Sequence, residues 1–115
     1  MNNIGKISVI NLKGKGVMKS RNLVYIGRRF GGYEGSVLGN KFKSGRDGSR
    51  DYVVEVLYRD WLFSEWKKKG VVYDELVRIK NLVLGGDDIM LGCWCYPLNC
   101  HGNIVKKCVE WMLKG

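Results

Sequence analysis

The chain has 115 residues, the size of one domain, and 45% of them are hydrophobic and 11% aromatic, which is enough to build a core. Its 20 Lys and Arg residues outnumber its 11 Asp and Glu residues, so the formal net charge is +9 at pH 7. No stretch approaches the ~20 apolar residues of a membrane helix, and the first residues lack the apolar segment of a signal peptide. We therefore expect one cytoplasmic domain over residues 1–115 without membrane contact.

The positive charge favours a partner that carries phosphate or another anion, although a solvated surface accounts for net charge equally well. The four cysteines are expected to be free thiols, because no secretion signal places the chain in an oxidising compartment. Cys93 alternates along an apolar run and Cys108 falls in a helical pattern, so we expect both in the core.

The N-terminal part of the chain reads as two strands. Residues 4–12 are rich in β-branched side chains, and Gly14 and Gly16 then supply a turn. Residues 23–26 form the second strand. The connection between them is short for a parallel crossover, so it predicts a hairpin.

Residues 27–48 form a long loop in which basic side chains alternate with glycines. Loops longer than about 12–15 residues in a compact domain are usually functional or disordered, and the basic and aromatic residues here favour function. Arginines suit bidentate phosphate contacts, and glycines let the backbone approach a ligand. The phosphate-loop pattern of nucleotide hydrolases is absent, and a solvated loop is the ordinary alternative.

Two helices are predicted after this loop. Ser49 is placed to cap the first, whose apolar residues recur at steps of three and four up to Gly70. A shorter helix is expected over residues 73–80.

The C-terminal part predicts a buried strand and a last helix. Residues 89–95 are almost continuously apolar, as in a central strand, and Asn99 is placed to cap the helix that follows. Together the elements predict an α/β domain with a small mixed sheet of about three to four strands flanked by about three helices.

Residues 93–102 read Cys-Trp-Cys-Tyr-Pro-Leu-Asn-Cys-His-Gly and link this strand to the helix. In open α/β sheets, ligands bind at the carboxyl ends of strands, and a helix N-terminus presents N–H groups to an anion. Cys100 and His101 are candidates for a reacting centre, because a helix start lowers a thiol pKa and an imidazole transfers protons. A buried thiol and a structural imidazole are the alternatives.

Zinc binding is a further interpretation, since Cys93, Cys95, Cys100 and His101 are all possible ligands. Zinc sites usually draw pairs of ligands from two separate segments, whereas neighbouring residues on a helix project about 100° apart. We therefore expect no bound metal, and no motif predicts a cofactor.

In four segments the chain resembles a family of small domains of unknown function that is common in phages and also occurs in bacteria. The family carries Val-Tyr-Ile-Gly-Arg, Asn-Pro-Phe, Gly-Arg-Asp-Gly-Thr-Arg and Cys-Trp-Cys-x-Pro-x-x-Cys-His-Gly. The corresponding segments here are residues 24–28, 40–42, 45–50 and 93–102. Lys41 stands where the family has proline, which leaves the loop less rigid, and Ser49 replaces threonine.

The resemblance spans about residues 7–112 and implies a phage or prophage origin, and thus a bacterial host cytoplasm, without an established reaction. The strand, loop and Cys-His helix start are also similar to nucleotide-binding α/β folds. That similarity implies a Rossmann-like arrangement at residues 89–102.

Our leading hypothesis is an accessory protein that binds a nucleotide and sequesters a host nucleotide signal. Arginines would hold phosphates, Phe42 or Tyr33 would stack on a base, and Asn40 and His101 would bind polar groups. The residues expected at the ligand are Arg28, Tyr33, Asn40, Phe42, Arg46, Arg50, Cys100, His101 and Gly102.

Two other functions stay open from sequence alone. One is an enzyme acting on nucleotides, a hydrolase or a glycosyl-transferring enzyme with Cys100 or His101 at the reacting centre. The other is nucleic-acid binding, which the charge favours but no recognised motif supports. We also expect a homo-oligomer, since so small a domain encloses little of a nucleotide and four tryptophans are many for its length.

Overall fold

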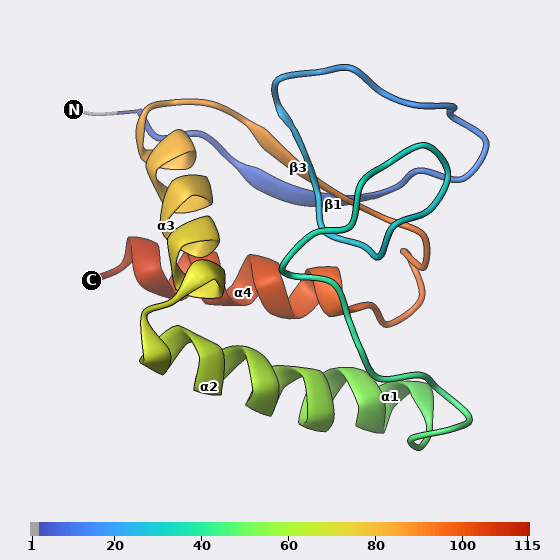
Figure 1. Cartoon of the computed structure of the whole chain (residues 1–115). Helices are drawn as coiled ribbons and strands as arrows, with labels where there is room; N and C mark the ends of the chain where they lie inside the picture. Colours follow the sequence, from blue (N-terminus) through green and yellow to red (C-terminus); the bar gives the residue numbers. More distant parts are fainter. Residues whose placement is uncertain (1–2) are drawn as a thin grey trace.

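A computed structural model describes residues 3–115 and shows an α/β fold (Figure 1). Within these residues three strands form one sheet in the order β1-β3-β2. The strands are β1 (Ile7–Asn11), β2 (Leu23–Tyr25) and β3 (Ile89–Cys93). The predicted α/β class is confirmed, and so is the central position of the apolar segment after residue 88.

Both neighbours of β3 run parallel to it, with Ile7 opposite Ile89 and Leu23 opposite Met90. The hairpin predicted for the first two strands is therefore wrong, and the sheet is parallel rather than mixed. The physical reason is that β3 is the most apolar strand and is stabilised best with a hydrogen-bonded neighbour on each edge. As a result, the carboxyl ends of all three strands meet at one edge of the sheet.

The helical elements are as follows: α1 (Arg50–Tyr52), the π-helix η1 (Val53–Tyr58), α2 (Arg59–Lys68), α3 (Val71–Leu84) and α4 (His101–Leu113). The first three form one continuous helical segment. The predicted cap is confirmed, because the Ser49 hydroxyl accepts a hydrogen bond of 3.2 Å from the Tyr52 N–H. The π-helix was not predicted, and α3 is longer than the predicted 73–80.

The core lies between the sheet and α4. Figure 1 shows α4 directly beneath the sheet and α2 beneath α4. Val9 and Leu91 are buried on the covered face of the sheet, whereas Ser8 is exposed, so the strands alternate as a sheet with one covered face does. Val105 and Val109 of α4 pack into this core, and α3 adds Leu76 and Ile79 to the same cluster. The N-terminus of α4 is thereby brought to the carboxyl edge of the strands.

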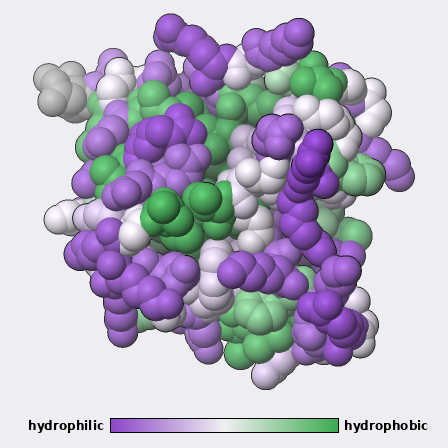
Figure 2. All heavy atoms as spheres, in the orientation of Figure 1, coloured by the Kyte–Doolittle hydropathy of each residue, from purple (hydrophilic) through white to green (hydrophobic). Residues whose placement is uncertain are grey.

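The Rossmann-like character implied for residues 89–102 stays a prediction, although a strand, a tight connection and a helix do follow one another there. No helix within residues 3–115 has the length and apolar character needed to cross a membrane. Figure 2 shows that hydrophilic side chains cover most of one face, with apolar side chains gathered in separate patches between them. The surface hydropathy alone therefore does not locate a site.

Candidate functional site

The site lies at the carboxyl edge of the sheet. Arg28 lies three residues beyond β2, and Cys95 two residues beyond β3. Because β2 and β3 are parallel neighbours, these two residues leave the sheet at the same edge. The start of α4, at Cys100 and His101, lies at this edge as well, so three segments that are far apart in the sequence meet there.

Two adjoining cavities of about 410 and 260 Å³ open at this edge, and both are lined by Arg28, Asn40, Cys95 and His101. We call them together the cationic hollow. The larger cavity adds Gly27, Arg29, Phe30 and Trp94. The smaller cavity adds Phe42, Lys43, Ser44, Arg50, Val53, Val54, Asn99 and Cys100.

The lining of the cationic hollow carries positive charge without a carboxylate to balance it. Arg28, Lys43 and Arg50 reach the smaller cavity from the loop and from α1, and no Asp or Glu of residues 3–115 lines either cavity. A cavity of about 500 Å³ elsewhere is lined by Glu34, Asp74 and Glu75 with Arg78 as the one cation, so its net charge is negative and disfavours an anion. The hollow at the sheet edge is therefore better suited to a phosphate than this acidic cavity.

His101 is buried at the floor of the hollow, and both of its ring nitrogens have neighbours. Nε2 lies 2.7 Å from the Ile26 carbonyl, and Nδ1 lies 3.7 Å from the Cys100 Sγ. Since a carbonyl only accepts, Nε2 carries the proton and Nδ1 is the acceptor in the neutral ring. Burial lowers the pKa of His101, so the imidazole is neutral at pH 7. The His101 ring therefore holds the segment after β2 and the start of α4 against each other.

Gly102 permits the close approach of α4 to the sheet. A Cβ atom at this position would lie 2.9 Å from Val9 Cγ1 and 3.2 Å from Ile26 Cδ1. Any larger residue would push α4 away from β1 and the end of β2. Gly102, predicted at the ligand, thus acts on the helix position, which in turn fixes His101.

The cap of α4 is Cys100 and not Asn99 as predicted. The Cys100 Sγ accepts the Gly102 N–H at 3.4 Å, and Cys100 is only 1% exposed. Asn99 instead donates from Nδ2 to Asp51 Oδ1 at 2.9 Å, and its carbonyl faces the Arg50 guanidinium at 3.5 Å. These two contacts join the loop before α4 to the start of α1 and place Arg50 over the hollow.

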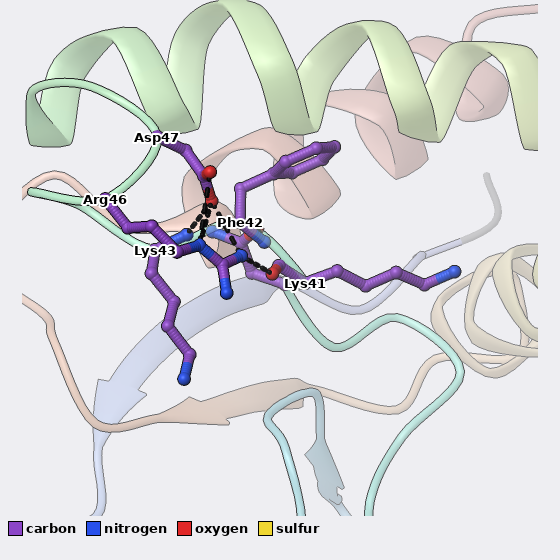
Figure 3. Close-up of polar contacts among 6 residues, drawn as sticks. Lys41, Phe42, Lys43, Arg46 and Asp47 are labelled. Atoms are coloured by element: carbon purple, nitrogen blue, oxygen red, sulfur yellow. Dashed lines mark hydrogen bonds and ion pairs between the residues drawn. The ribbon is translucent and has the colours of Figure 1, made fainter.

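The predicted basic loop is held by Asp47, as Figure 3 shows. The Arg46 guanidinium donates to the Asp47 carboxylate at 2.8 Å and to the Lys41 carbonyl at 3.3 Å, and the Lys43 N–H donates to the same carboxylate at 2.8 Å. The hydrogen bond from Arg46 lowers the pKa of Asp47, and that of Arg46 is raised. The structure does not bring Arg46 into the cationic hollow, where Lys43 lies in its place.

Two residues predicted to stack on a base are engaged inside the protein. The Phe42 ring points toward the helical segment (Figure 3) and packs against the core. Tyr33 stacks on Tyr25 with ring centroids 4.6 Å apart, and its hydroxyl accepts the Met18 N–H at 2.7 Å. Asn40 does line both cavities, and its Oδ1 accepts the Phe42 N–H at 2.9 Å, which leaves its amide NH₂ to donate.

An aromatic pair that sequence reasoning missed lies at the hollow: Phe30, which is exposed, and Trp94, which is half-buried. Phe30 is 64% exposed, and its ring lies edge-on to Trp94 at 5.1 Å. The Tyr25 hydroxyl accepts the Trp94 Nε1–H at 2.8 Å and donates to the Arg28 carbonyl, so it positions both residues. The sequence did contain a signal for Trp94. Side chains of an extended segment alternate between two faces, so Trp94 lies on the face opposite the buried Cys93.

The four cysteines, all in the described part of the chain, are free thiols. Cys93 and Cys100 are buried, while Cys95 is half-buried and lines the hollow. Among residues 3–115 no three His, Cys, Asp or Glu side chains are placed to hold a metal ion. The geometry therefore does not fit the zinc interpretation.

The fold and the hollow define a small α/β protein with a cationic cavity at the carboxyl edge of a parallel sheet. The chain belongs to the family described as Domain of unknown function (DUF4326), whose model matches residues 10–111. Comparison with curated proteins and with solved structures gives no match.

Proposed function

We propose that the protein binds a small phosphate-bearing ligand of the nucleotide type in the cationic hollow. The observation that carries this proposal is the convergence of Arg28, Lys43 and Arg50 on one cavity that has no carboxylate in its lining. Unbalanced guanidinium and ammonium groups at a concave site favour an anion, and arginine suits phosphate in particular. The two cavities have the size of small-molecule sites, which run to about 300–1,000 Å³.

The ligand is oriented by groups of different chemistry. Arg50 and Lys43 hold phosphate in the smaller cavity, and Arg28 lies where the two cavities meet. Phe30 and Trp94 offer an aromatic surface for a base in the larger cavity, since base stacking on aromatic side chains contributes ~1–3 kcal/mol. The Asn40 amide donates to polar groups of the ligand.

Binding without turnover is the function that the hollow supports best. Cys100 and His101, the candidates for a reacting centre, are buried and hydrogen-bonded to each other and to the backbone. A general base needs a free lone pair within reach of the substrate, and the His101 lone pair at Nδ1 faces Cys100. The role we propose is a phage-type accessory protein that sequesters a nucleotide signal of the host. The motif resemblance at residues 93–102 supports the phage origin only, and the cationic hollow supports the nucleotide.

Self-association is proposed as well. A groove between α2 and α4 is lined by Phe63 and Trp111, which are 48% and 54% exposed. Large exposed aromatic side chains in a mostly apolar groove favour an interface. The cationic hollow shares no lining residue with this groove, so a second copy over the groove would leave the hollow open to the ligand.

The test of the proposed function is a panel of cyclic dinucleotides, ADP-ribose derivatives and mononucleotides screened by thermal shift. A ligand at 100 times its Kd should stabilise the fold by about 2.7 kcal/mol, which raises the Tm of a domain of this size by several degrees. Chromatography of the recovered ligand separates a binder from an enzyme, since only an enzyme alters it. If no nucleotide of the panel shifts the Tm, the proposal fails.

The dependence of affinity on salt concentration distinguishes nucleic-acid binding from the binding of a small ligand. A protein that covers many phosphates of a polymer loses affinity steeply with salt, whereas a hollow that holds one small ligand releases few counterions. We expect weak dependence on salt for the ligand found in the panel.

A further inference from the structure

The larger cavity of the cationic hollow is lined by side chains that donate hydrogen bonds. Arg28 and Arg29 contribute two guanidinium groups, which donate and do not accept. Asn40 contributes its amide NH₂, because its Oδ1 already accepts the Phe42 N–H at 2.9 Å. A ligand that enters this cavity therefore meets donors from several directions.

The acceptors of the same lining are mostly engaged inside the protein. The His101 lone pair at Nδ1 faces the Cys100 Sγ at 3.7 Å. Four backbone carbonyls of the lining each accept a hydrogen bond from within the chain, namely those of Gly27, Arg28, Phe30 and Cys95. The larger cavity therefore favours a ligand edge that carries acceptors, since a donor placed there would lose its hydrogen bonds to water.

The backbone of Phe30 is fixed by a tight turn. The Phe30 N–H donates to the Tyr33 carbonyl at 3.2 Å, and the Tyr33 N–H donates to the Phe30 carbonyl at 3.0 Å. Gly31 and Gly32 between them have φ values of 60° and 90°, as a type I′ turn requires. Tyr33 is itself held by its stack on Tyr25. A base that stacks on the exposed Phe30 ring therefore has little loop to order, which lowers the entropic cost of binding.

Arg29 precedes this turn and takes no part in the phosphate contacts proposed above. It forms one ion pair, in which its Nε lies 3.9 Å from Glu34 Oε2, and both side chains are exposed. An exposed ion pair of this kind contributes little to stability. Because the contact is made through Nε, the two terminal nitrogens of the guanidinium can donate parallel hydrogen bonds to a ligand.

We propose that the base of the ligand is guanine, that it stacks on Phe30, and that the Arg29 guanidinium donates to its O6 and N7. Guanine carries these two acceptors side by side on one edge, whereas adenine carries the N6 amino donor beside N7. An arginine bound to O6 and N7 is the commonest base-specific contact in the readout of DNA. This inference rests on the proposed function, because it names the base of the nucleotide that the hollow holds.

A series of nucleoside diphosphates tests the base on the wild-type chain. Calorimetry with GDP, IDP, 7-deaza-GDP and ADP keeps the sugar and both phosphates the same, so only the base differs. IDP retains O6 and N7 and should bind as GDP does. ADP should bind roughly fivefold to a hundredfold more weakly than GDP, and 7-deaza-GDP, which lacks the N7 acceptor, should fall between them. UDP and CDP should also bind more weakly than GDP, because a single ring covers less of Phe30.

The variant Arg29→Gln tests the residue. A glutamine side chain pairs with N6 and N7 of adenine as arginine pairs with O6 and N7 of guanine. The variant should therefore lose affinity for GDP by roughly fivefold to a hundredfold and should bind ADP at least as tightly as the wild-type chain does.

The matched control is Arg21→Gln. Arg21 is also exposed and forms one weak ion pair, at 3.7 Å with Asp87, but it lines neither cavity of the hollow. Its variant loses the same charge and should keep the wild-type preference for GDP over ADP.

The outcomes separate this inference from the proposed function. Equal affinity of the wild-type chain for GDP and ADP would overturn the guanine assignment and leave phosphate binding in place, whereas binding of none of these diphosphates would overturn both. IDP as weak as ADP would place recognition at the 2-amino group and contradict the contact with O6 and N7. A preference for GDP that persists in Arg29→Gln would contradict the role of Arg29. The series on the wild-type chain gives its answer even if the variant fails to fold.

Discussion

The imidazole of His101 donates from Nε2 to the Ile26 carbonyl at 2.7 Å. This hydrogen bond joins the first residue of α4 to the residue that follows β2, across 75 positions of sequence. It holds the segment that carries Arg28 against the segment that carries Cys100. The lining of the cationic hollow therefore depends on a neutral, buried histidine.

That histidine makes stability depend on pH. Burial lowers the folded-state pKa of His101, and the charge of Arg28 acts in the same direction. The unfolded chain, with a pKa near 6.5, then binds more protons below that pH, so stability is full above about pH 6.5 and falls as the pH decreases. The slope is at most about 1.4 kcal/mol per pH unit.

Urea unfolding between about pH 5.5 and 7.5 measures this slope. His101→Gln is the comparison, because its amide can donate to the Ile26 carbonyl but does not titrate. We expect the wild-type curve to fall toward acid and the His101→Gln curve to be flatter. Parallel curves would mean that His101 does not carry the pH dependence.

Gly102→Ala should destabilise the protein, against the usual trend in helices. Alanine normally stabilises a helix by ~0.5–1 kcal/mol relative to glycine. At this position the added Cβ would lie 2.9 Å from Val9 Cγ1, and overpacking of this kind costs ~1–3 kcal/mol. Asn103→Ala is the control. It also raises the helix propensity of α4, but at the next residue, whose side chain is only half-buried. Thermal unfolding that shows Gly102→Ala as stable as Asn103→Ala would contradict the close packing.

Phe30→Ala should weaken binding of a nucleotide without affecting the fold. Phe30 is 64% exposed and lines the larger cavity beside Trp94, so truncation removes a stacking surface and little of the core. The expected loss is ~1–3 kcal/mol of binding free energy, measured by calorimetry. Phe63→Ala, another exposed phenylalanine, should have no effect on affinity because Phe63 lies on α2 outside the hollow. If Phe30→Ala binds the nucleotide with the same affinity as the wild-type chain, the base does not stack on Phe30.

Self-association through the groove between α2 and α4 predicts a concentration-dependent mass in light scattering. Trp111→Ala should shift the equilibrium toward the monomer, because Trp111 is 54% exposed and lines the groove. Large aromatic residues are frequent hot spots of interfaces. A wild-type chain that is monomeric at micromolar concentration would rule out this interface.

The sequence predicts the parts of the fold that depend on local pattern. The apolar run at residues 89–93 is the central strand, and Ser49 caps the first helix. The predicted hairpin was wrong because β3, the last strand of the sequence, lies between β1 and β2. The length of the connection between β1 and β2 carries no information about that later strand. Asn99 was preferred as a cap on residue statistics, but Asp51 binds its amide in the folded chain.

The site was only partly predictable for a related reason. Arg28 and Arg50 both line the hollow, because Arg28 follows β2 by three residues and Arg50 begins α1. Arg46 belongs to the same sequence motif but is bound by Asp47, its immediate neighbour. Which aromatic side chains are exposed depends on the path of the loop after β2, and no local pattern determines that path.

The central claim is that Arg28 and Arg50 hold a phosphate in the cationic hollow. Calorimetric titration of the nucleotide that gives the largest thermal shift tests it most directly, on the wild-type chain, Arg28→Gln, Arg50→Gln and the control Arg59→Gln. Arg59 is an exposed cation of α2 outside the hollow, so its variant removes the same charge. The account predicts that each of the first two variants loses ~1.5–3 kcal/mol, a weakening of about tenfold to a hundredfold, while Arg59→Gln binds as wild type. Equal affinity in all four chains would contradict it.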